Sequence, residues 1–446
     1  MADHTGEVTD LLQQLIRQEC VNDGTITSGG EARSADLLGS YLEGAGLDLA
    51  TYEPAPGRVS LLTRIEGSDP TAPSLMLMGH TDVVPVTATN WQRDPFAAEL
   101  VDGEVWGRGA TDMLNLTASM AVAVRQLATS GFRPRGTLVY LAVADEEALG
   151  AYGAEWLTER EGDAVGVDYV ITEGGGAVLP SPTGPKLSAA AAEKGTHWCK
   201  LRVKGSPSHA SRPFRTDNAL VRAAEIVQRI ASYRPETKIG DVWRRNVASM
   251  GFDAELSAAL TDPDRLWETC ETLPGLNLAR QAHACTHLTI APTVVRGGTK
   301  TNVIPDVVEV ELDIRTLPGQ SSDEVMAVID ELLGEHRDAV DVEMSGCFSP
   351  ATESPVETPL WDAMEKVARR LRPDVRVVPT LMAGATDARF FRRMGATAYG
   401  FGLMSGRIPI DQLAQMFHGD NERIDQESLR LSTELWIALA KEFLDG

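Results

Sequence analysis

The sequence has little positive charge, and most of its basic residues are arginine. Its 446 residues include 41 Lys and Arg against 64 Asp and Glu, which gives a formal net charge of −23, and only eight residues are lysine. A field this negative repels phosphate backbones and anionic membrane surfaces, and no dense basic run offsets it. We therefore expect neither a nucleic acid nor a membrane as a partner.

Cysteine is scarce, and long apolar runs are absent. The five cysteines are odd in number, widely spread and without a Cys-x-x-Cys pair: Cys20, Cys199, Cys270, Cys285 and Cys347. This pattern favours reduced, buried thiols over a disulfide framework or a cysteine zinc site. The N-terminus lacks a basic flank followed by an apolar core, and nowhere do about 18 apolar residues run together. We expect a cytoplasmic location.

The first part of the chain alternates predicted strands with predicted helices. Helical spacing of apolar residues marks 8–20, 31–46 and 116–127, and extended apolar runs mark 59–65, 74–78, 136–144 and 167–172. This order predicts an α/β fold with a mixed, mainly parallel sheet flanked by helices. A ligand site is then expected beyond the carboxyl ends of the strands.

A second domain is predicted within the first, because the pattern changes after a loop rich in Gly, Ser and Pro at 174–185. One-faced antiparallel strands are predicted at 197–203, 307–315 and 339–345, with helices at 217–232 and 321–333. This is a β-α-β-β-α-β pattern, which a polar helical segment near 236–287 interrupts. A helix at 359–371 resumes the α/β pattern, and the last helix is predicted at 427–443. We expect a catalytic domain at 1–195 and 350–446 and an inserted α+β domain at 196–349.

Polar residues gather where the predicted strands end or in the loops beside them. They are His80, Asp82, Asp112, Glu146, Glu147, Glu173 and His418. If the strands are neighbours, these side chains converge on one rim, where the carboxylates repel one another unless a cation is present. Nitrogen and oxygen ligands without thiolate fit zinc, and less specifically cobalt or manganese. A bridging carboxylate can hold two such ions roughly 3.5–4 Å apart, as in hydrolytic two-metal sites.

Nine short segments, taken together and in order, resemble the M20 family of co-catalytic zinc peptidases and deacylases. That family includes aminoacylase, glutamate carboxypeptidase, succinyl-diaminopimelate desuccinylase and carnosine dipeptidase. The segments are residues 79–85, 106–113, 145–147, 172–175, 208–213, 301–306, 313–315, 385–391 and 417–419. Because they span nearly the whole chain, the resemblance covers both predicted domains.

The resemblance implies a role for each residue of the predicted rim. Asp112 would bridge two zinc ions, His80 and Glu173 would complete one ion's ligands, and Glu147 and His418 would complete the other's. Asp82 would hydrogen-bond the far nitrogen of His80, and Glu146 would act as general base and then general acid. Glu146 and Glu147 can serve different roles because neighbouring side chains diverge in extended backbone.

The inserted domain resembles the family's lid and dimerisation domain, which implies a homodimer. His209 would stabilise the oxyanion, and in dimeric relatives this histidine comes from the partner subunit. Asn302, Arg315 and Thr386 resemble the groups that orient the substrate, and a guanidinium suits a substrate carboxylate. Arg315 could equally pair only with acids on the face of its sheet.

One residue departs from the family pattern, and one histidine pair imitates a metal site. Leu114 stands where the family commonly has a lysine, two residues after the bridging aspartate. His283 and His287 have the i, i+4 spacing of a metalloprotease helix but lack its glutamate, so we do not expect them to bind a metal.

The function that the resemblance implies is a dinuclear zinc hydrolase. It would cleave an amide bond next to a free carboxylate in a short peptide or an N-acyl amino acid, as a carboxypeptidase or deacylase does. A dipeptidase of the same family is the alternative within the enzyme class. The alternative outside it is a catalytically silent binding protein, for which loss of Glu146 or of a ligand would be the sign, and all of these residues are present.

Overall fold

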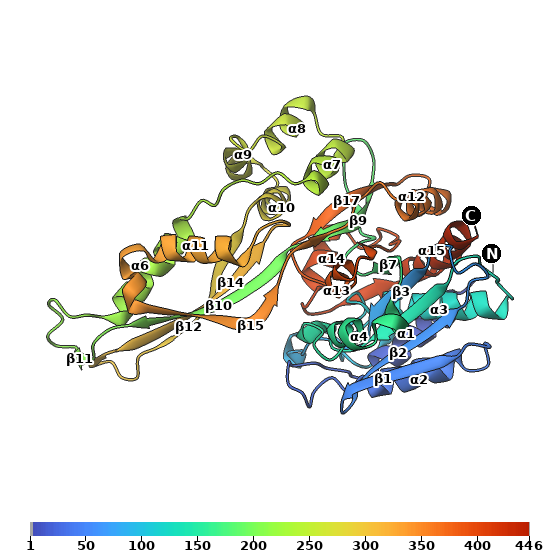
Figure 1. Ribbon diagram of the computed structural model, residues 1–446, viewed down its shortest axis with the longest axis horizontal. Coiled ribbons are helices and arrows are strands. Elements are labelled where there is room, and N and C mark those ends of the chain that lie inside the picture. Colours follow the sequence, from blue (N-terminus) through green and yellow to red (C-terminus); the bar gives the residue numbers. More distant parts are fainter. Residues whose placement is uncertain (1–2, 446) are drawn as a thin grey trace.

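The computed structural model describes residues 3–445, apart from the side chains of 345–347. It consists of an α/β domain and an elongated α+β domain that projects from it (Figure 1). The thiols of Cys20, Cys199, Cys270 and Cys285 are free, and Cys347 lies outside the described side chains. No described helix is long and apolar enough to cross a membrane.

The α/β domain is built on a ten-stranded sheet in the order β1-β2-β6-β3-β7-β18-β9-β16, with β8 and β17 also paired to β9. Its strands are β1 (Leu49–Ala55), β2 (Arg58–Ile65), β3 (Leu75–His80), β6 (Leu138–Val143), β7 (Tyr169–Thr172), β8 (Val178–Leu179), β9 (Lys186–Glu193), β16 (Thr352–Glu353), β17 (Arg376–Met382) and β18 (Thr397–Gly400). Strands β6, β3, β7 and β18 run parallel. The predicted fold class is therefore confirmed, and the carboxyl ends of these four strands share one edge.

Helices cover both faces of this sheet, which explains why β3 and β6 are buried at every position and mostly apolar. On one face lie α1 (Thr5–Ile16), α2 (Ala32–Leu42), α3 (Leu114–Thr129), α12 (Pro359–Leu371) and α15 (Gln426–Leu444), and on the other lie α4 (Ala154–Arg160), α5 (Gly162–Val165) and α13 (Ala388–Arg393). In β3, Leu75 and Leu77 pack in the first core, whereas Met76 and Met78 pack in the second. The remaining elements of this domain are β4 (Glu99–Val101), β5 (Glu104–Trp106), β19 (Arg423–Asp425) and α14 (Ile410–Met416), with short 3-10 turns at Ala88–Asn90 and Glu146–Ala148.

The projecting domain has the predicted β-α-β-β-α-β order. Its antiparallel sheet is β12-β14-β10-β15, made of β10 (Gly195–Lys204), β12 (Thr289–Gly297), β14 (Val307–Thr316) and β15 (Val340–Ser349), with α6 (Ala219–Ser232) and α11 (Ser322–Leu333) packed on one face and a 3-10 turn at Gly334–Ala339. Strand β14 alternates buried and partly buried residues, as a one-faced strand should. A small two-stranded antiparallel sheet of β11 (Ser208–His209) and β13 (Val303–Ile304) forms its far end (Figure 1).

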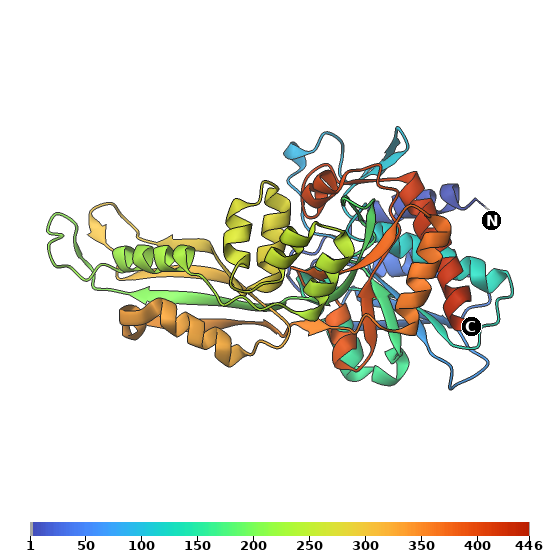
Figure 2. The ribbon, with the colours of Figure 1, turned by 90° about the horizontal axis from the view of Figure 1, so that it is seen from above.

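Four helices stand in the corner between the two domains: α7 (Asp241–Met250), α8 (Ala254–Leu260), α9 (Leu266–Thr272) and α10 (Leu276–Thr286). Figure 2 shows them beside the junction, seen from above. The amide of Asn246 in α7 donates to the carbonyl of Pro379 in β17 at 2.8 Å, and both groups are buried. This helical insertion therefore packs against the α/β domain, although its chain interrupts the projecting one.

Candidate metal centre

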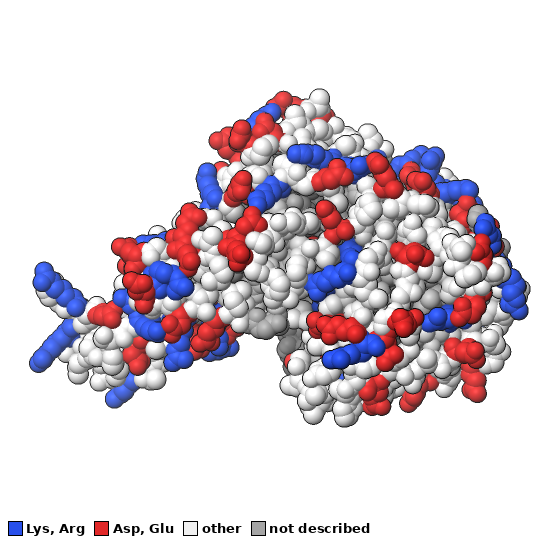
Figure 3. All heavy atoms as spheres, in the orientation of Figure 1, with Lys and Arg blue, Asp and Glu red and all other residues white. Residues whose placement is uncertain are grey.

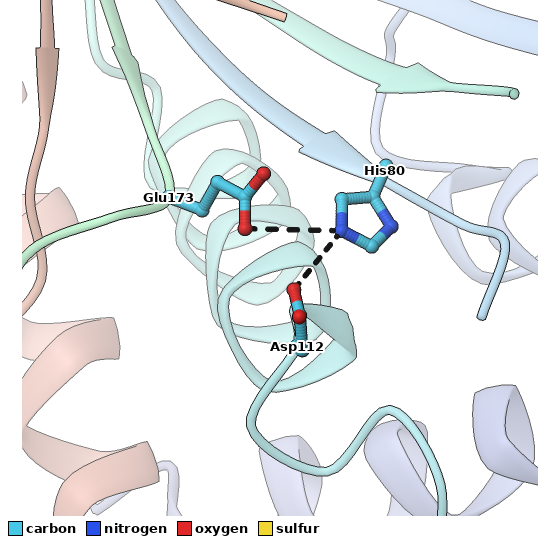
Figure 4. Close-up of side chains that lie close together, drawn as sticks. All are labelled: His80, Asp112 and Glu173. Atoms are coloured by element: carbon cyan, nitrogen blue, oxygen red, sulfur yellow. Dashed lines mark hydrogen bonds and ion pairs between the residues drawn. The ribbon is translucent and has the colours of Figure 1, made fainter. Parts of the chain in front are cut away.

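The first cluster of candidate ligands lies at the carboxyl edge of the parallel strands. His80 ends β3, Glu173 follows β7, and Asp112 lies in the loop before α3. The Nε2 atom of His80 lies 3.4 Å from Oδ1 of Asp112 and 3.9 Å from Oε2 of Glu173. Figure 4 shows both carboxylates turned toward this imidazole.

The second cluster shares Asp112 with the first. Nε2 of His418 lies 3.3 Å from Oδ2 of Asp112 and 3.1 Å from Oε2 of Glu147. In each cluster the candidate ligand atoms lie within 4.8 Å of one another. The two oxygens of Asp112 thus face two different imidazoles, which is the arrangement a bridging carboxylate needs.

The electrostatics of both clusters fit a cation. Burial lowers the pKa of the His80 imidazole, but the Asp112 hydrogen bond and nearby carboxylates outweigh it and raise that pKa well above its usual value. Hydrogen bonds that the His418 imidazole donates to Asp112 and Glu147 raise its pKa to about 10, and burial raises the pKa of Glu173. Oε1 of Glu147 is buried with no hydrogen-bond partner among the described residues. Divalent ions would take the place of the protons and would give this oxygen a partner.

We expect metal affinity to rise with pH. A histidine binds a metal only as the neutral imidazole. His418 has a pKa near 10, so below that pH it carries a second ring proton, which the ion must displace. Affinity should therefore rise by up to about tenfold per pH unit for each displaced proton. Titration calorimetry of the metal-free protein with Zn²⁺, in buffers of different ionisation enthalpy, measures the protons released; affinity that stays flat from about pH 6 to 8 would contradict the argument.

Asp82 supports the centre in a different way from the one predicted. Nδ1 of His80 lies 2.9 Å from the backbone carbonyl of Asp82 and 3.5 Å from its carboxylate. The carboxylate instead accepts hydrogen bonds from the amide of Asn22 at 2.9 Å and from the backbone amides of Glu146 and Glu147 at 3.2 and 3.1 Å. Its main contacts therefore hold the backbone that carries both glutamates.

An extended backbone was predicted at these two glutamates, and the structure shows a different conformation. Residues Glu146–Ala148 form a 3-10 turn between Asp145 and Leu149, which have φ values of 70° and 76°. Glu146 and Glu147 both line the cavity described below, but only Glu147 belongs to a candidate ligand cluster. The tight turn, rather than strand alternation, separates the two side chains.

Glu422 is a supporting residue that no sequence pattern marks. It is fully buried and accepts hydrogen bonds from the backbone amides of Gly109, Thr111 and Asp112 at 2.8, 2.6 and 3.0 Å. It also accepts from the hydroxyl of Thr111 and pairs with Arg108 at 2.9 Å. One carboxylate thus fixes the loop that carries Asp112, from more than 300 residues away in the chain.

Changing Glu422 to Gln should cost about 3 kcal/mol in the free energy of unfolding, because it leaves Arg108 buried without a counter-charge. It should also weaken metal binding about 10–100-fold by loosening the Asp112 loop. Urea denaturation and competition with a chelating dye measure the two effects. The matched control is Glu104→Gln, which removes a partly exposed pair with Arg423 and should cost about 1 kcal/mol or less.

A cavity of about 640 Å³ opens beside the clusters and extends to the projecting domain. Its lining includes Asp112, Glu147, Glu173 and His418, together with Glu146 and Arg315. Nε of Arg315 donates to Asp313 at 2.7 Å. Arg315 therefore pairs with an acid of its own strand, as one prediction has it. It also lines the cavity, where the other prediction has it orient the substrate.

Three other predicted site residues lie apart from the clusters. His209 and Asn302 are exposed at the far end of the projecting domain, where the backbone amide of Ala210 donates to the carbonyl of Asn302. This tip is basic, with Arg212, Arg215 and Lys300 exposed (Figure 3). Thr386 is buried, and its hydroxyl and amide donate to Glu193 at 2.8 and 2.7 Å. These contacts make Thr386 part of the scaffold.

Leu114 and the pair of His283 and His287 both lie outside the candidate ligand clusters. Leu114 is buried in the core of the α/β domain and does not line the cavity. His283 and His287 stack with ring centroids 4.7 Å apart, against the edge of Trp267. Burial lowers the pKa of His287 to about 4. The pair belongs to no candidate ligand cluster among the described residues.

Comparison with known proteins identifies the family. The sequence profile of peptidase family M20/M25/M40 matches residues 76–442. The chain belongs to this family. This protein is thus a metal-dependent hydrolase that acts on amide bonds. The two clusters that share Asp112 are its candidate metal-binding groups.

Individual relatives show how far the similarity extends. The N-fatty-acyl-amino acid synthase/hydrolase PM20D1 of Xenopus tropicalis is 27% identical over 393 residues, which cover 86% of this chain and 75% of that protein. Aminoacylase-1 of Homo sapiens is 27% identical over 401 residues, which cover 88% and 86%. The fold resembles that of the M20 family metallo-carboxypeptidase Sso-CP2 from Sulfolobus solfataricus, with a TM-score of 0.75, 18% identity and 99% of each chain covered.

Proposed function

We propose that this protein is a dinuclear zinc hydrolase of the deacylase or carboxypeptidase type. Its substrate would be an N-acyl amino acid or a short peptide, cleaved at the amide bond next to a free carboxylate. The observation that carries the proposal is Asp112, whose two oxygens face His80 and His418 in two separate clusters. Similarity to aminoacylase-1 and PM20D1 supports the choice of an N-acyl amino acid, and we place the reaction in the cytoplasm.

Each residue of the centre then has a defined task. His80, Glu173 and Asp112 would hold one ion, and Glu147, His418 and Asp112 the other. When bound, the ions would polarise the amide carbonyl and make an activated water available near neutral pH. Glu146, which faces the cavity beside both clusters, would take the proton of the attacking water and return it to the leaving amine. Arg315 would orient the substrate carboxylate.

A hydrolysis screen tests the proposal directly. The metal-free protein is supplied with zinc, cobalt or manganese and offered N-acyl amino acids, dipeptides and the corresponding amides that lack a free carboxylate. We expect metal-dependent release of the amino acid from the N-acyl compounds and little from the blocked amides. Faster cleavage of dipeptides would favour the dipeptidase alternative. If no compound is cleaved, the proposed reaction is rejected.

The position of His209 suggests that two copies of the chain cooperate. Its exposed imidazole lies at the tip of the projecting domain, far from the centre in its own chain (Figure 1). Its Nδ1 accepts from the backbone amide of Ser211 at 3.1 Å, which leaves Nε2 as the donor nitrogen. We propose a homodimer in which this lid tip reaches the partner's centre, where His209 and Asn302 would help to stabilise the oxyanion and to orient the substrate.

Mixing two inactive variants should restore activity if this arrangement is correct. A His209→Ala subunit keeps its own Glu146, and a Glu146→Gln subunit supplies the missing histidine. Random mixing should give about a quarter of the wild-type activity, because half of the dimers are mixed and each has one complete site. Differently tagged subunits, purified as verified heterodimers, provide the measurement; heterodimers no more active than the parent variants would exclude action in trans.

A further inference from the structure

The turn that carries Glu146 is strained at both of its ends. Asp145 and Leu149 flank it with φ values of 70° and 76°, in the left-handed region that residues other than glycine rarely adopt. The carboxylate of Asp145 holds the first end, because it accepts from the backbone amide of Tyr152 at 2.8 Å and from the side-chain amide of Asn22 at 3.1 Å. Leu149 has no polar side chain, so other residues must hold the second end.

Arg389 of α13 contacts this second end of the turn. Its side chain is buried, and Nη2 donates to the carbonyl of Leu149 at 2.8 Å while Nη1 donates to the carbonyl of Thr386 at 2.7 Å. The first of these bonds joins residues that are 240 positions apart in the chain. Because a guanidinium is a rigid fork, it fixes the turn relative to the start of α13.

Asp387 lies against the residue that follows the turn. A Cβ added to Gly150, which has a φ of 77°, would lie 2.7 Å from Oδ1 of Asp387, so this close approach requires glycine. Both oxygens of Asp387 are buried without a hydrogen-bond partner among the described residues. Burial raises the pKa of Asp387 to about 7, and the positive charge of Arg389 opposes that rise. Asp387 and Arg389 thus bring opposite charges to the end of the turn.

Both charges also act on Glu146 itself. Burial raises the pKa of Glu146; the charge of Asp387 adds to this rise, and that of Arg389 opposes it. Arg389 does not line the cavity and belongs to neither candidate ligand cluster, among the residues that the structure describes. An effect of Arg389 on the reaction must therefore pass through the turn rather than through contact with a substrate or an ion.

The start of α13 is attached to the junction of the two domains. The backbone amide and hydroxyl of Thr386 donate to Oε2 of Glu193, the last residue of β9 before the chain enters the projecting domain. Oε1 of the buried Glu193 accepts from the hydroxyl of Thr352 at 2.9 Å and from Arg392 at 3.1 Å. Thr352 begins β16, where the chain has returned from that domain. Glu193 therefore connects both crossings between the domains to α13.

Building on the proposed function, we propose that Arg389 is a positioning residue for Glu146. It holds the turn at Leu149, and α13 takes its own position from Glu193 at the junction of the domains. Glu146 would then face the attacking water only while this connection is intact. The segment 385–391, which the sequence marked by resemblance alone, acquires a task in this way.

The first test is Arg389→Met, which keeps an unbranched side chain and removes the guanidinium. We expect kcat of the zinc-loaded enzyme for an N-acyl amino acid to fall about 100-fold, with KM within about threefold, because a displacement of about 1 Å can cost that much. The matched control is Arg393→Met, an exposed arginine of the same helix that also packs over Phe390, and it should keep the wild-type kcat. A kcat of Arg389→Met within threefold of the wild type overturns the proposal.

A double variant separates positioning from a general loss of folded protein. In the Glu146→Gln background, Arg389→Met should lower kcat by less than about threefold, because the two residues act on one step. A further loss of about 100-fold would show that Arg389 acts elsewhere. If Arg389→Met does not fold, Gly150→Ala replaces it: its Cβ would displace the turn from Asp387 and should lower kcat about tenfold, and an unchanged kcat would reject the proposal.

Hydrogen exchange tests the position of the turn without any reaction. The amide of Leu149 donates to the carbonyl of Glu146 at 2.8 Å, and that of Gly150 donates to Asp145 at 2.7 Å. Both amides should exchange at least about tenfold faster in Arg389→Met and at the wild-type rate in Arg393→Met. If the wild type hydrolyses no compound, the proposed function fails, and faster exchange still supports the hold of Arg389 on the turn. Equal exchange rejects that hold whatever the activity.

Discussion

Replacing Glu146 with glutamine should lower kcat by roughly 10³-fold or more while metal binding stays normal. The amide keeps the shape of the side chain but cannot accept a proton from water, and general acid–base catalysis by a positioned carboxylate is worth about 10²–10⁴-fold. Glu146 is not in either candidate ligand cluster, so its loss should leave both ions in place. Burial raises the pKa of Glu146, as befits a group that must both take and return a proton.

The measurement pairs steady-state kinetics with the metal content of the dialysed protein. The matched control is Glu255→Gln, an exposed glutamate of the insertion whose partner is Arg265, and it should behave as the wild type. Turnover within tenfold of the wild type, with metal content unchanged, would remove Glu146 from the role of base. Loss of one ion from the variant would instead make Glu146 a ligand.

The convergence of the candidate ligands could be predicted in part because the sequence places two of them at the ends of apolar strands. His80 and Glu173 close β3 and β7, which are parallel neighbours, so the rule that parallel strands end at one edge brings them together. His418 lies after a helix rather than a strand. Only the resemblance to a family, and not periodicity, linked it to Asp112 in advance.

The supporting contacts could not be predicted, because they join segments that are distant in the chain. Nothing local to Glu422 marks it as the acceptor for the loop at 109–112, and nothing local to Asn22 marks it as a partner of Asp82. Strand β9 escaped prediction for another reason: its run of alanines has a low β propensity, and its conformation follows from pairing with β17 inside the sheet. Tertiary pairing overrides local preference there.

Asp112→Ala should abolish binding of both ions and lower kcat by about 10³-fold or more. Because Asp112 is shared by the two clusters, removing its carboxylate would take one ligand from each of the two proposed ions, and each ion would supply several kcal/mol of stabilisation to transition-state charge. Glu147→Ala should differ, because Glu147 belongs to one cluster alone. That variant should retain about one ion per subunit.

Metal analysis after dialysis against a weak chelator distinguishes these outcomes, and Asp420→Ala serves as the matched control. Asp420 is exposed two residues after His418 and belongs to neither cluster, so its loss should leave both ions bound. One tightly held ion in Asp112→Ala would show that the clusters do not share a bridge. The protein would then be a mononuclear hydrolase whose second histidine serves another purpose.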